Sequence, residues 1–407
     1  MADSKSVSRF IQDKLFHLCT ITAPRPVGSK CNQEAGEYIE TILLQSSFNV
    51  SRQTFNCLDW ISEGAELVID GLSFEVQPSP YSLGCEISAE LIVVSTVEEL
   101  ENSNIEGKLL LLMGDIASEQ LMPKNFVFYN PEHHKKIYGL LEKKNPAALI
   151  TATAKNPETA GSMYPFPLFE DGDFNIPSVY MKDIEGEKLA SCSDKIITLK
   201  SSAQRIPSTG FNISAERGSG EKGKILFLGH YDAKENTPGA LDNGTGTAVL
   251  LALGELLKNY DGDLGLEILP VNGEDYYSAA GQMKYLELNE GKISDIVCAV
   301  NIDAPGYIKG ETHYSFYECP ETIQRTAHRT LGNRPGIHEG EQWFQSDHMI
   351  FAQNKRPAMA ISSEHMAMIC SEIAHTPHDN LELVDYDKLA ELALGLRDMF
   401  LGIAEKH

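Results

Sequence analysis

Basic residues are scarce in this sequence. It has 34 lysines and arginines against 58 aspartates and glutamates, which gives a formal net charge of −24 at pH 7. A surface of this sign repels nucleic-acid backbones and anionic membranes, so we expect neither as a partner. Because the acidic residues are spread along the chain without a long block, we expect most of them on a solvated surface.

Long hydrophobic runs and paired cysteines are absent as well. The N-terminal residues MADSKSVSRFIQDKLF lack the continuous apolar segment of a signal peptide, and no run is long enough to span a bilayer. The eight cysteines include no C-x-x-C pair, which indicates reduced thiols in a reducing compartment. Together these absences predict a cytoplasmic protein.

The chain does contain enough apolar residues for two domains. With 407 residues, 42% of them hydrophobic, two domains are expected rather than one. Residues 60–203 have short strand patterns, their own apolar content and no cluster of catalytic residues, so they predict an inserted, smaller, β-rich domain. Residues 1–59 and 204–407 then form the main domain. His133 and His134 lie in the insert beside lysines, which favours a solvated face over a ligand role.

The main domain alternates between apolar strand runs and segments with helical spacing. This alternation predicts an α/β fold with a mostly parallel sheet covered by helices on both faces. The expected strands are Phe48–Phe55, Phe211–Ala215, Lys224–Leu228, Leu266–Val271, Asp295–Ile302 and Ala358–Ser362. The expected helices are Ser8–Thr20, Gln33–Leu44, Thr247–Leu257, Ala279–Glu287, Thr322–Leu331 and Tyr386–Ala404.

Side chains that bind metals follow the ends of these strands. The clearest case is the polar stretch GHYDAKENTPGALDNGTG at 229–246, which lies between an apolar strand and a helix. In open α/β sheets, ligands bind outside the carboxyl ends of the strands. Histidine and aspartate together suit a borderline cation such as zinc. The residues at strand ends are His230, Asp232, Asp242, Glu274, Asp275, Asp303 and His375.

The composition of this set favours two ions and a separate base. Two zinc ions about 3.5–4 Å apart need a shared carboxylate between them, and Asp242 is central in the order. Hydrolysis also needs a base that lies close to the ions without binding them. Because neighbouring side chains at a strand end point in different directions, Glu274 can remain free as the base while Asp275 binds. The alternative for this acidic pair is an exposed turn.

Six segments of the chain resemble a known family. They are His-Tyr-Asp at 230–232, Pro-Gly-Ala-Leu-Asp-Asn-Gly at 238–244, Gly-Glu-Asp at 273–275, Asn-Ile-Asp at 301–303, Ser-Asp-His at 346–348 and His-Thr-Pro-His-Asp at 375–379. These segments resemble the family 28 metallopeptidases, which include dizinc aminopeptidases and glutamate carboxypeptidases. Glutaminyl cyclases and the transferrin receptor ectodomain are relatives. PRPVGSK at 24–30 resembles the N-terminal motif of the family, and the insert resembles its protease-associated domain.

The resemblance implies a zinc-dependent exopeptidase fold and a site for two zinc ions. It also implies that Glu274 is the general base and that Asp232 fixes the tautomer of a ligand histidine. A cis peptide bond is expected between Asp242 and Asn243. One zinc would be held by His230, Asp242 and Asp303, and the other by Asp242, Asp275 and His375.

The implied function is zinc-dependent removal of the N-terminal residue from peptides that have a free amino group. A carboxypeptidase of the glutamate carboxypeptidase type, a glutaminyl cyclase and a noncatalytic receptor-like protein are the alternatives. Ser346-Asp347-His348 could also be taken for a nucleophile with its base, although adjacent residues rarely form a triad, so we expect this segment to shape the substrate pocket.

Three features depart from the family pattern, and one of them is Ala304-Pro305-Gly306 after Asp303, which predicts an unusual local pocket. Glu-Asp at 274–275 replaces the Glu-Glu of many members. Ala374 replaces a tyrosine that hydrogen-bonds the oxyanion in several members, and Tyr276, Tyr277 and His365 are the candidates to supply that bond instead.

Overall fold

The computed structural model describes residues 3–155 and 160–406. The chain divides into two compact units. The first contains residues 3–57, 209–276 and 280–406, and the second contains residues 58–155, 160–208 and 277–279. Among the described residues, no helix has the length and apolar character needed to cross a membrane.

The first unit is built on a mixed sheet whose centre is parallel. Its strands lie in the order β13, β12, β14, β11, β9, β10 and β8, and β1 pairs with β8. The neighbours β14, β11, β9 and β10 are all parallel, whereas β8 and β12 join this group antiparallel. The strand bounds are β1 Asn49–Ile69, β8 Ile196–Arg217, β9 Lys224–His230, β10 Gly265–Val271, β11 Ile296–Ile302, β12 Thr312–Tyr317, β13 Ile337–Glu339 and β14 Ala358–Ser363.

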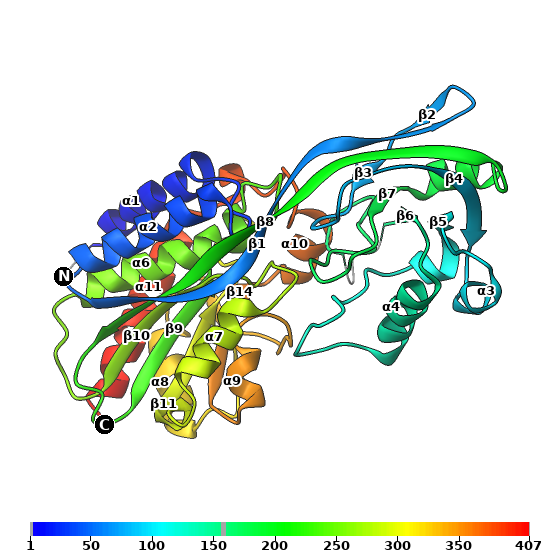
Figure 1. Ribbon diagram of the computed structural model, residues 1–407. Helices are drawn as coiled ribbons and strands as arrows, with labels where there is room; N and C mark the ends of the chain where they lie inside the picture. The colour runs from blue at the N-terminus through cyan, green and yellow to red at the C-terminus, as the bar shows by residue number, and fades with distance from the viewer. Residues whose placement is uncertain (1–2, 156–159, 407) are drawn as a thin grey trace. The chain divides into compact units, whose positions relative to one another are not determined.

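Helices cover both faces of this sheet (Figure 1). On one face α1 (Ser4–Phe16), α2 (Lys30–Gln45), α6 (Thr245–Leu257) and α11 (Tyr386–Ala404) pack together. On the other face lie α7 (Ala280–Leu288) and α9 (Met349–Gln353), whose Tyr285 and Phe351 rings meet edge to face with centroids 5.8 Å apart. The predicted α/β fold is therefore confirmed.

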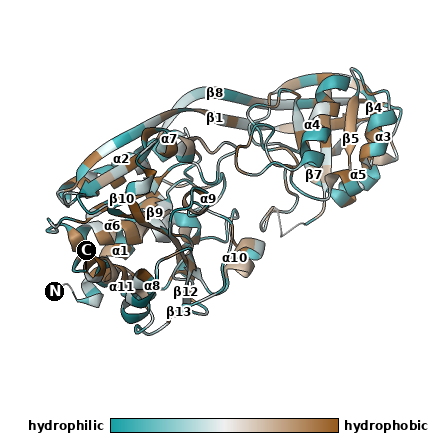
Figure 2. Ribbon diagram, turned by 90° about the horizontal axis from the view of Figure 1, so that it is seen from below, coloured by the Kyte–Doolittle hydropathy of each residue, from teal (hydrophilic) through white to brown (hydrophobic). Residues whose placement is uncertain are grey.

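Burial explains why these segments fold as they do. Every residue of β9 after Lys224 and every residue of β10 is buried, which is the pattern expected for parallel strands covered on both faces. Helix α6 is apolar almost all round and is buried along nearly its whole length. Figure 2 shows the hydrophobic stretches concentrated in the strands and in the helices packed on them.

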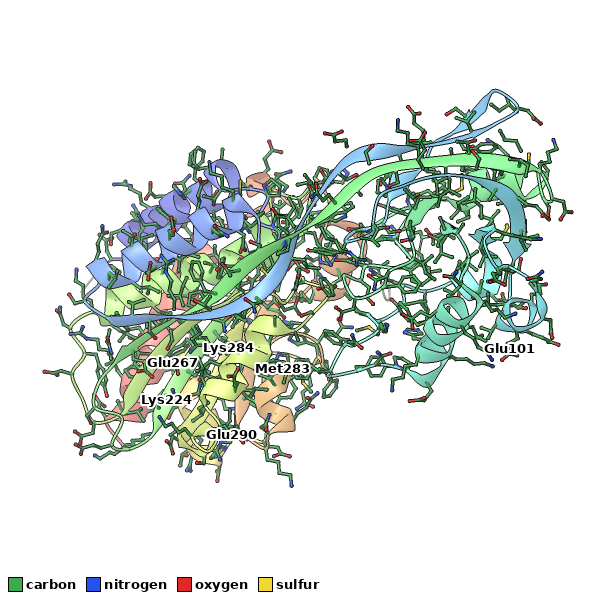
Figure 3. The ribbon with its side chains drawn as sticks, viewed as in Figure 1. Glu101, Lys224, Glu267, Met283, Lys284 and Glu290 are labelled. Atoms are coloured by element: carbon green, nitrogen blue, oxygen red, sulfur yellow. The ribbon has the colours of Figure 1, made fainter. Side chains whose placement is uncertain are left out.

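One buried charge in this sheet is balanced locally. Glu267 of β10 is 1% exposed and lies 2.5 Å from the Nζ atom of Lys224 on β9 (Figure 3). The hydroxyls of Ser214 and Tyr285 donate to the same carboxylate at 2.7 and 3.0 Å. A buried carboxylate is costly unless it is paired and hydrogen-bonded, and Glu267 meets both conditions.

The second unit has its own group of strands, which continue the sheet beyond β8, and its own apolar core. Its strands β4, β5, β6 and β7 are parallel neighbours, with β8 antiparallel to β4 and β3 antiparallel to β7. Apolar clusters cover both sides of the sheet. The bounds are β2 Leu72–Phe74, β3 Gln77–Pro78, β4 Cys85–Val94, β5 Leu109–Leu112, β6 Ala148–Thr153, β7 Ser178–Lys182, α3 Val97–Asn102, α4 Glu132–Lys144 and α5 Asp183–Ala190.

The structure differs from the predicted elements mainly in strand length. The strands expected at 48–55 and 211–215 belong to β1 and β8, which have 21 and 22 residues and pass from one unit into the other. Their exposed and half-buried stretches lack the apolar run that marks a buried strand, so the pattern revealed only the buried parts. No strand was predicted between Asp303 and Thr322, but this stretch contains β12.

Candidate metal centre

The carboxyl ends of the parallel strands bring the predicted ligands together. His230 is the last residue of β9, Glu274 and Asp275 follow β10, and Asp303 follows β11. Asp242 lies in the segment Ala240–Gly244 directly before α6. The last expected ligand, His375, follows helix α10 (Met366–Glu372) and has a φ of 65°. The expected cis peptide bond between Asp242 and Asn243 is present.

Asp242 lies between the two histidines. Its Oδ1 atom is 3.2 Å from Nε2 of His230, and its Oδ2 atom is 3.2 Å from Nε2 of His375. Asp303 Oδ1 is 3.7 Å from Nε2 of His230, and Asp275 Oδ1 is 2.9 Å from Nε2 of His375. The donor atoms of each triad lie within 4.8 Å of one another. One carboxylate is therefore shared between two groups of three donors.

The donor atoms suit zinc. Imidazole nitrogen and carboxylate oxygen are both zinc ligands, and a third ligand in each group leaves a position for water or substrate. The Nε2 atom of His230 and the Oδ1 atom of Asp303 are buried and make no hydrogen bond in the protein. Buried polar atoms are normally satisfied, so these two atoms are placed for a partner such as a cation.

The charges of the first group depend on one another. Burial alone would lower the pKa of His230, but the surrounding carboxylates, chiefly Asp232 and Asp242, raise this pKa well above its ordinary value. Burial alone would raise the pKa of Asp242, but the neighbouring imidazoles of His230 and His375 lower it well below its ordinary value. Asp242 is therefore an anion at neutral pH, as a shared ligand must be.

The acidic pair 274–275 lies in a setting that opposes a further negative charge. Burial is the largest cause that raises the pKa of Glu274 well above its ordinary value, and Asp275 adds to the effect. The pKa of Asp275 is also raised, first by burial and then by Asp242. Divalent cations beside these carboxylates would favour their ionised forms.

The carboxylate of Asp232 organises the turn that carries this pair. Its Oδ1 atom accepts the backbone N–H groups of Gly273 at 2.6 Å and Glu274 at 3.3 Å, and its Oδ2 atom accepts that of Asp275 at 3.0 Å. His230 Nδ1 lies 3.2 Å from the backbone carbonyl of Asp232 and 3.7 Å from Oδ1. The shorter contact to His230 is thus with the backbone carbonyl, and the main partners of the carboxylate are the three amides.

Two further buried residues, Arg25 and Asp379, hold the segment that carries Asp242. The guanidinium of Arg25 donates to the carbonyls of Leu18, Tyr231, Pro238 and Gly239. Asp379 accepts the N–H groups of Leu241 at 2.7 Å and Asp242 at 3.0 Å. We did not predict either role, although both residues lie in segments that resemble family motifs.

The nucleophile interpretation of Ser346-Asp347-His348 is wrong. The hydroxyl of Ser346 donates to Asp303 Oδ2 at 2.5 Å, whereas His348 Nε2 contacts the carbonyl of Trp343 at 3.0 Å. Gln282 donates to Asp347 Oδ1 at 3.0 Å. The serine hydroxyl therefore serves a carboxylate and not a histidine base.

The candidates for the missing oxyanion donor have different surroundings. Tyr276 is 5% exposed. Tyr277 clusters with the second unit, where its ring packs against that of Tyr81 with centroids 4.9 Å apart. The ring of His365 faces Tyr307 edge-on at 6.5 Å. Which of them replaces the tyrosine lost at Ala374 stays a prediction.

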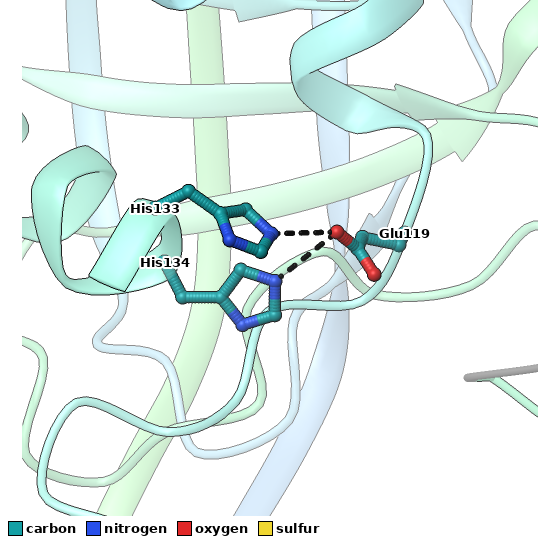
Figure 4. A group of neighbouring side chains, drawn as sticks. All are labelled: Glu119, His133 and His134. Atoms are coloured by element: carbon teal, nitrogen blue, oxygen red, sulfur yellow. Dashed lines mark hydrogen bonds and ion pairs between the residues drawn. The ribbon is translucent and has the colours of Figure 1, made fainter. Parts of the chain in front are cut away.

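A second group of metal-binding side chains lies in the second unit. Figure 4 shows His133 and His134 of α4 directed at Glu119, whose Oε1 atom is 2.8 and 3.3 Å from their Nε2 atoms. The His134 side chain is 3% exposed, so the solvated face that we expected is wrong for this residue. The backbone N–H of Met122 donates to His134 Nδ1 at 3.0 Å. A neutral imidazole that accepts at Nδ1 carries its proton on Nε2, which disfavours metal binding there.

Comparison with known proteins identifies the first unit. The family model described as Peptidase family M28 matches residues 212–399, which include all the predicted ligands and the predicted base. Residues 212–399 belong to peptidase family M28. The family resemblance deduced from the sequence is therefore confirmed. The M28 match begins in β8 and ends in α11, so it covers the parallel sheet and its carboxyl edge.

Individual similar proteins are distant in sequence and similar in fold. The chain is 23% identical over 257 residues to aminopeptidase YwaD of Bacillus subtilis, a match that spans 58% of this chain and 56% of that protein. The aminopeptidase of Aneurinibacillus sp. strain AM-1 superposes with a TM-score of 0.72 and 21% identity over 99% of this chain and 94% of that chain. The zinc aminopeptidase BSAP of Bacillus subtilis superposes with a TM-score of 0.74 and 18% identity over 96% of this chain and 93% of that chain.

Proposed function

We propose that the protein is a zinc-dependent aminopeptidase that removes the N-terminal residue from peptides. The observation that carries this proposal is the position of Asp242, whose two oxygens each lie 3.2 Å from a different histidine. A carboxylate between two histidines and two further aspartates supports a pair of zinc ions with one shared ligand. The three similar proteins bear the name aminopeptidase, and one is named a zinc enzyme, which supports the same activity here.

The proposed ligands follow from the two groups of donors. The shared ligand is Asp242, with His230 and Asp303 on one side and Asp275 and His375 on the other. Zinc bound there would lower the pKa of a bound water and would polarise the carbonyl of the scissile peptide bond.

Glu274 is the proposed general base. It belongs to the same strand end as Asp275, and its backbone is held by the carboxylate of Asp232. Burial raises its pKa, which brings the carboxylate closer to the working pH of a group that both accepts and returns a proton. Glu274 would take a proton from the attacking water and deliver it to the amine that leaves.

The proposed substrate is a peptide with a free amino group. Five carboxylates lie at one sheet edge, those of Asp232, Asp242, Glu274, Asp275 and Asp303, and their charge exceeds that of two zinc ions, which favours an ammonium group beside the reacting bond. Binding that group would limit cleavage to the first residue of the chain, which makes the enzyme an exopeptidase.

We also propose a cytoplasmic location, and the assignment of residues 60–203 as a protease-associated domain stays a prediction.

The test is hydrolysis of aminoacyl anilides by the purified protein, beside N-acetylated versions of the same compounds. We expect release only from unblocked substrates, loss of activity after chelation and recovery with zinc or cobalt. Glu274→Gln is expected to lower kcat by about 10²- to 10⁴-fold while zinc content stays the same. Glu287→Gln, an exposed site on α7, is the matched control.

Two outcomes would contradict the proposal. Equal cleavage of the acetylated compounds would exclude an aminopeptidase and would favour an endopeptidase or an acylase. Zinc-loaded protein that cleaves no unblocked substrate would redirect the assignment to the carboxypeptidase or glutaminyl cyclase activities, which acidic dipeptides and N-terminal glutamine peptides then test.

A further inference from the structure

Ser346 has a backbone conformation that its side chain does not favour. Its φ is 80°, in the left-handed region that glycine adopts readily and other residues adopt at a cost. Residues held in this region often lie at functional sites, where neighbouring structure maintains them. Ser346 lies in the irregular segment before α9, and a glycine there would relieve the backbone cost.

The side chain of Ser346 links two residues at the end of β11. Its Oγ atom lies 2.5 Å from Asp303 Oδ2 and 2.8 Å from Nδ2 of Asn301. An ionised carboxylate can only accept hydrogen bonds, so the serine proton must point to Asp303. The remaining contact of Oγ is then an accepted bond, which requires the amide nitrogen of Asn301 to be the donor. The direction of the chain Asn301 to Ser346 to Asp303 is thereby fixed.

This chain of hydrogen bonds leaves one oxygen of Asp303 free. Oδ2 is occupied by the serine hydroxyl, whereas Oδ1 is buried without a hydrogen bond and lies 3.7 Å from Nε2 of His230. A partial rotation of the carboxylate about its Cβ–Cγ bond would move both oxygens from these positions and would break the bond to Ser346. Partners of this kind orient ligands at metal sites and tune their basicity.

We propose that Ser346 is a positioning residue that sets the orientation of Asp303 for metal binding, and that Asn301 acts through it. The unfavourable backbone conformation is retained because it places the hydroxyl against Asp303. This inference rests on the proposed function, since it takes Asp303 as a zinc ligand.

The test is zinc titration of chelator-treated protein against a competing chromophoric chelator, together with thermal unfolding of the zinc-free form. Ser346→Gly removes the hydroxyl and suits the positive φ, so we expect the zinc-free variant to unfold at or above the wild-type Tm. Its affinity for one of the two zinc ions is expected to fall about 10- to 100-fold. A residue with only a structural role would not lose zinc affinity while retaining stability.

Lys355→Gly is the matched control. Lys355 is exposed, has a φ of 56° and lies on the turn after α9, so glycine makes the same backbone change there without touching the site. We expect this control to leave both zinc affinities at the wild-type value. Asn301→Ala is expected to lower the affinity for the same zinc ion as Ser346→Gly. The double variant is expected to lose no more zinc affinity than Ser346→Gly alone.

The outcomes separate this inference from the proposed function. Wild-type zinc affinity in Ser346→Gly, with two ions bound to the wild type, would overturn the role of Ser346 and leave the peptidase proposal intact. Additive losses in the double variant would overturn the relay from Asn301. A wild-type chain that binds no zinc would overturn both proposals together.

Discussion

The Oδ1 atom of Asp232 lies 2.6 Å from the backbone nitrogen of Gly273. The same carboxylate also accepts the N–H groups of Glu274 and Asp275, so a single side chain from the end of β9 fixes the turn after β10. The proposed base and one proposed ligand therefore share one support. Loss of these hydrogen bonds would move both groups relative to the site. Short displacements of a positioned group are costly for catalysis, so the rate would fall.

The first prediction concerns this support. Asp232→Asn replaces one carboxylate oxygen by an NH₂ group, which cannot accept the amide protons that the lost oxygen accepts. We expect activity to fall by about 10- to 100-fold. Steady-state kinetics and zinc content measure the effect, with Asp261→Asn as an exposed control. Wild-type kinetics in Asp232→Asn would show that the turn does not depend on the carboxylate.

The second prediction concerns Arg25. Its side chain is fully buried, and its planar fork donates to four backbone carbonyls. Lysine has a single nitrogen and cannot reproduce this geometry, so Arg25→Lys leaves buried carbonyls unsatisfied. We expect the free energy of unfolding to fall by about 3 kcal/mol or more, measured by urea denaturation. Arg9→Lys, at an exposed position of α1, should change it by less than about 0.5 kcal/mol.

The third prediction concerns acid stability. Burial lowers the pKa of His348 from 6.5 to about 4. Between these values the unfolded chain binds a proton that the folded chain does not, so stability falls as the pH decreases through this window. From pH 7 to pH 5 we expect the zinc-free wild type to lose about 2 kcal/mol more than His348→Phe, which has no group to protonate. Parallel stability curves for the two proteins would contradict the lowered pKa.

The fourth prediction concerns zinc stoichiometry. We expect two zinc ions per chain, because the donors form two groups that share Asp242. Saturation at about 1,000 times the dissociation constant should stabilise the chelator-treated protein by about 4 kcal/mol for each ion. Asp242→Asn is expected to lower the affinity for both zinc ions. His133→Ala should leave the count at two, because the tautomer of His134 opposes binding in the second unit.

Binding of three ions to the wild type, with loss of one in His133→Ala, would contradict this prediction. Isothermal titration and metal analysis of the dialysed protein give the count directly. A wild-type value of one would favour a single-zinc site instead.

The site was predictable because topology and chemistry agree. Each parallel strand is marked in the sequence by an apolar run, and the carboxyl ends of such strands meet at one edge. Residues at those ends, such as His230 and Asp303, could therefore be assigned to one place before their contacts were known. The family motifs then separated the expected base, Glu274, from its neighbour Asp275.

Other features could not be predicted, because they depend on contacts between distant parts of the chain. Arg25 reaches carbonyls more than 200 residues away, and nothing in its own segment indicates them. The burial of His134 depends on the loop that contains Met122, since the lysines around it favoured solvent. The sequence predicted only that Ser346 helps to shape a pocket. Its positive φ and its hydrogen bond to Asp303 are visible only in the structure.

The sequence by itself determined the α/β architecture, the family and the set of residues at the sheet edge, because periodicity and motif spacing are local properties of the chain. Only the tertiary structure decided which oxygen of each carboxylate faces which partner. Asp232 holds three backbone amides, and Asp242 divides its oxygens between two histidines. Hydrogen bonds have strict distances and directions, so these roles are fixed by the packing of strands and loops and not by the order of residues.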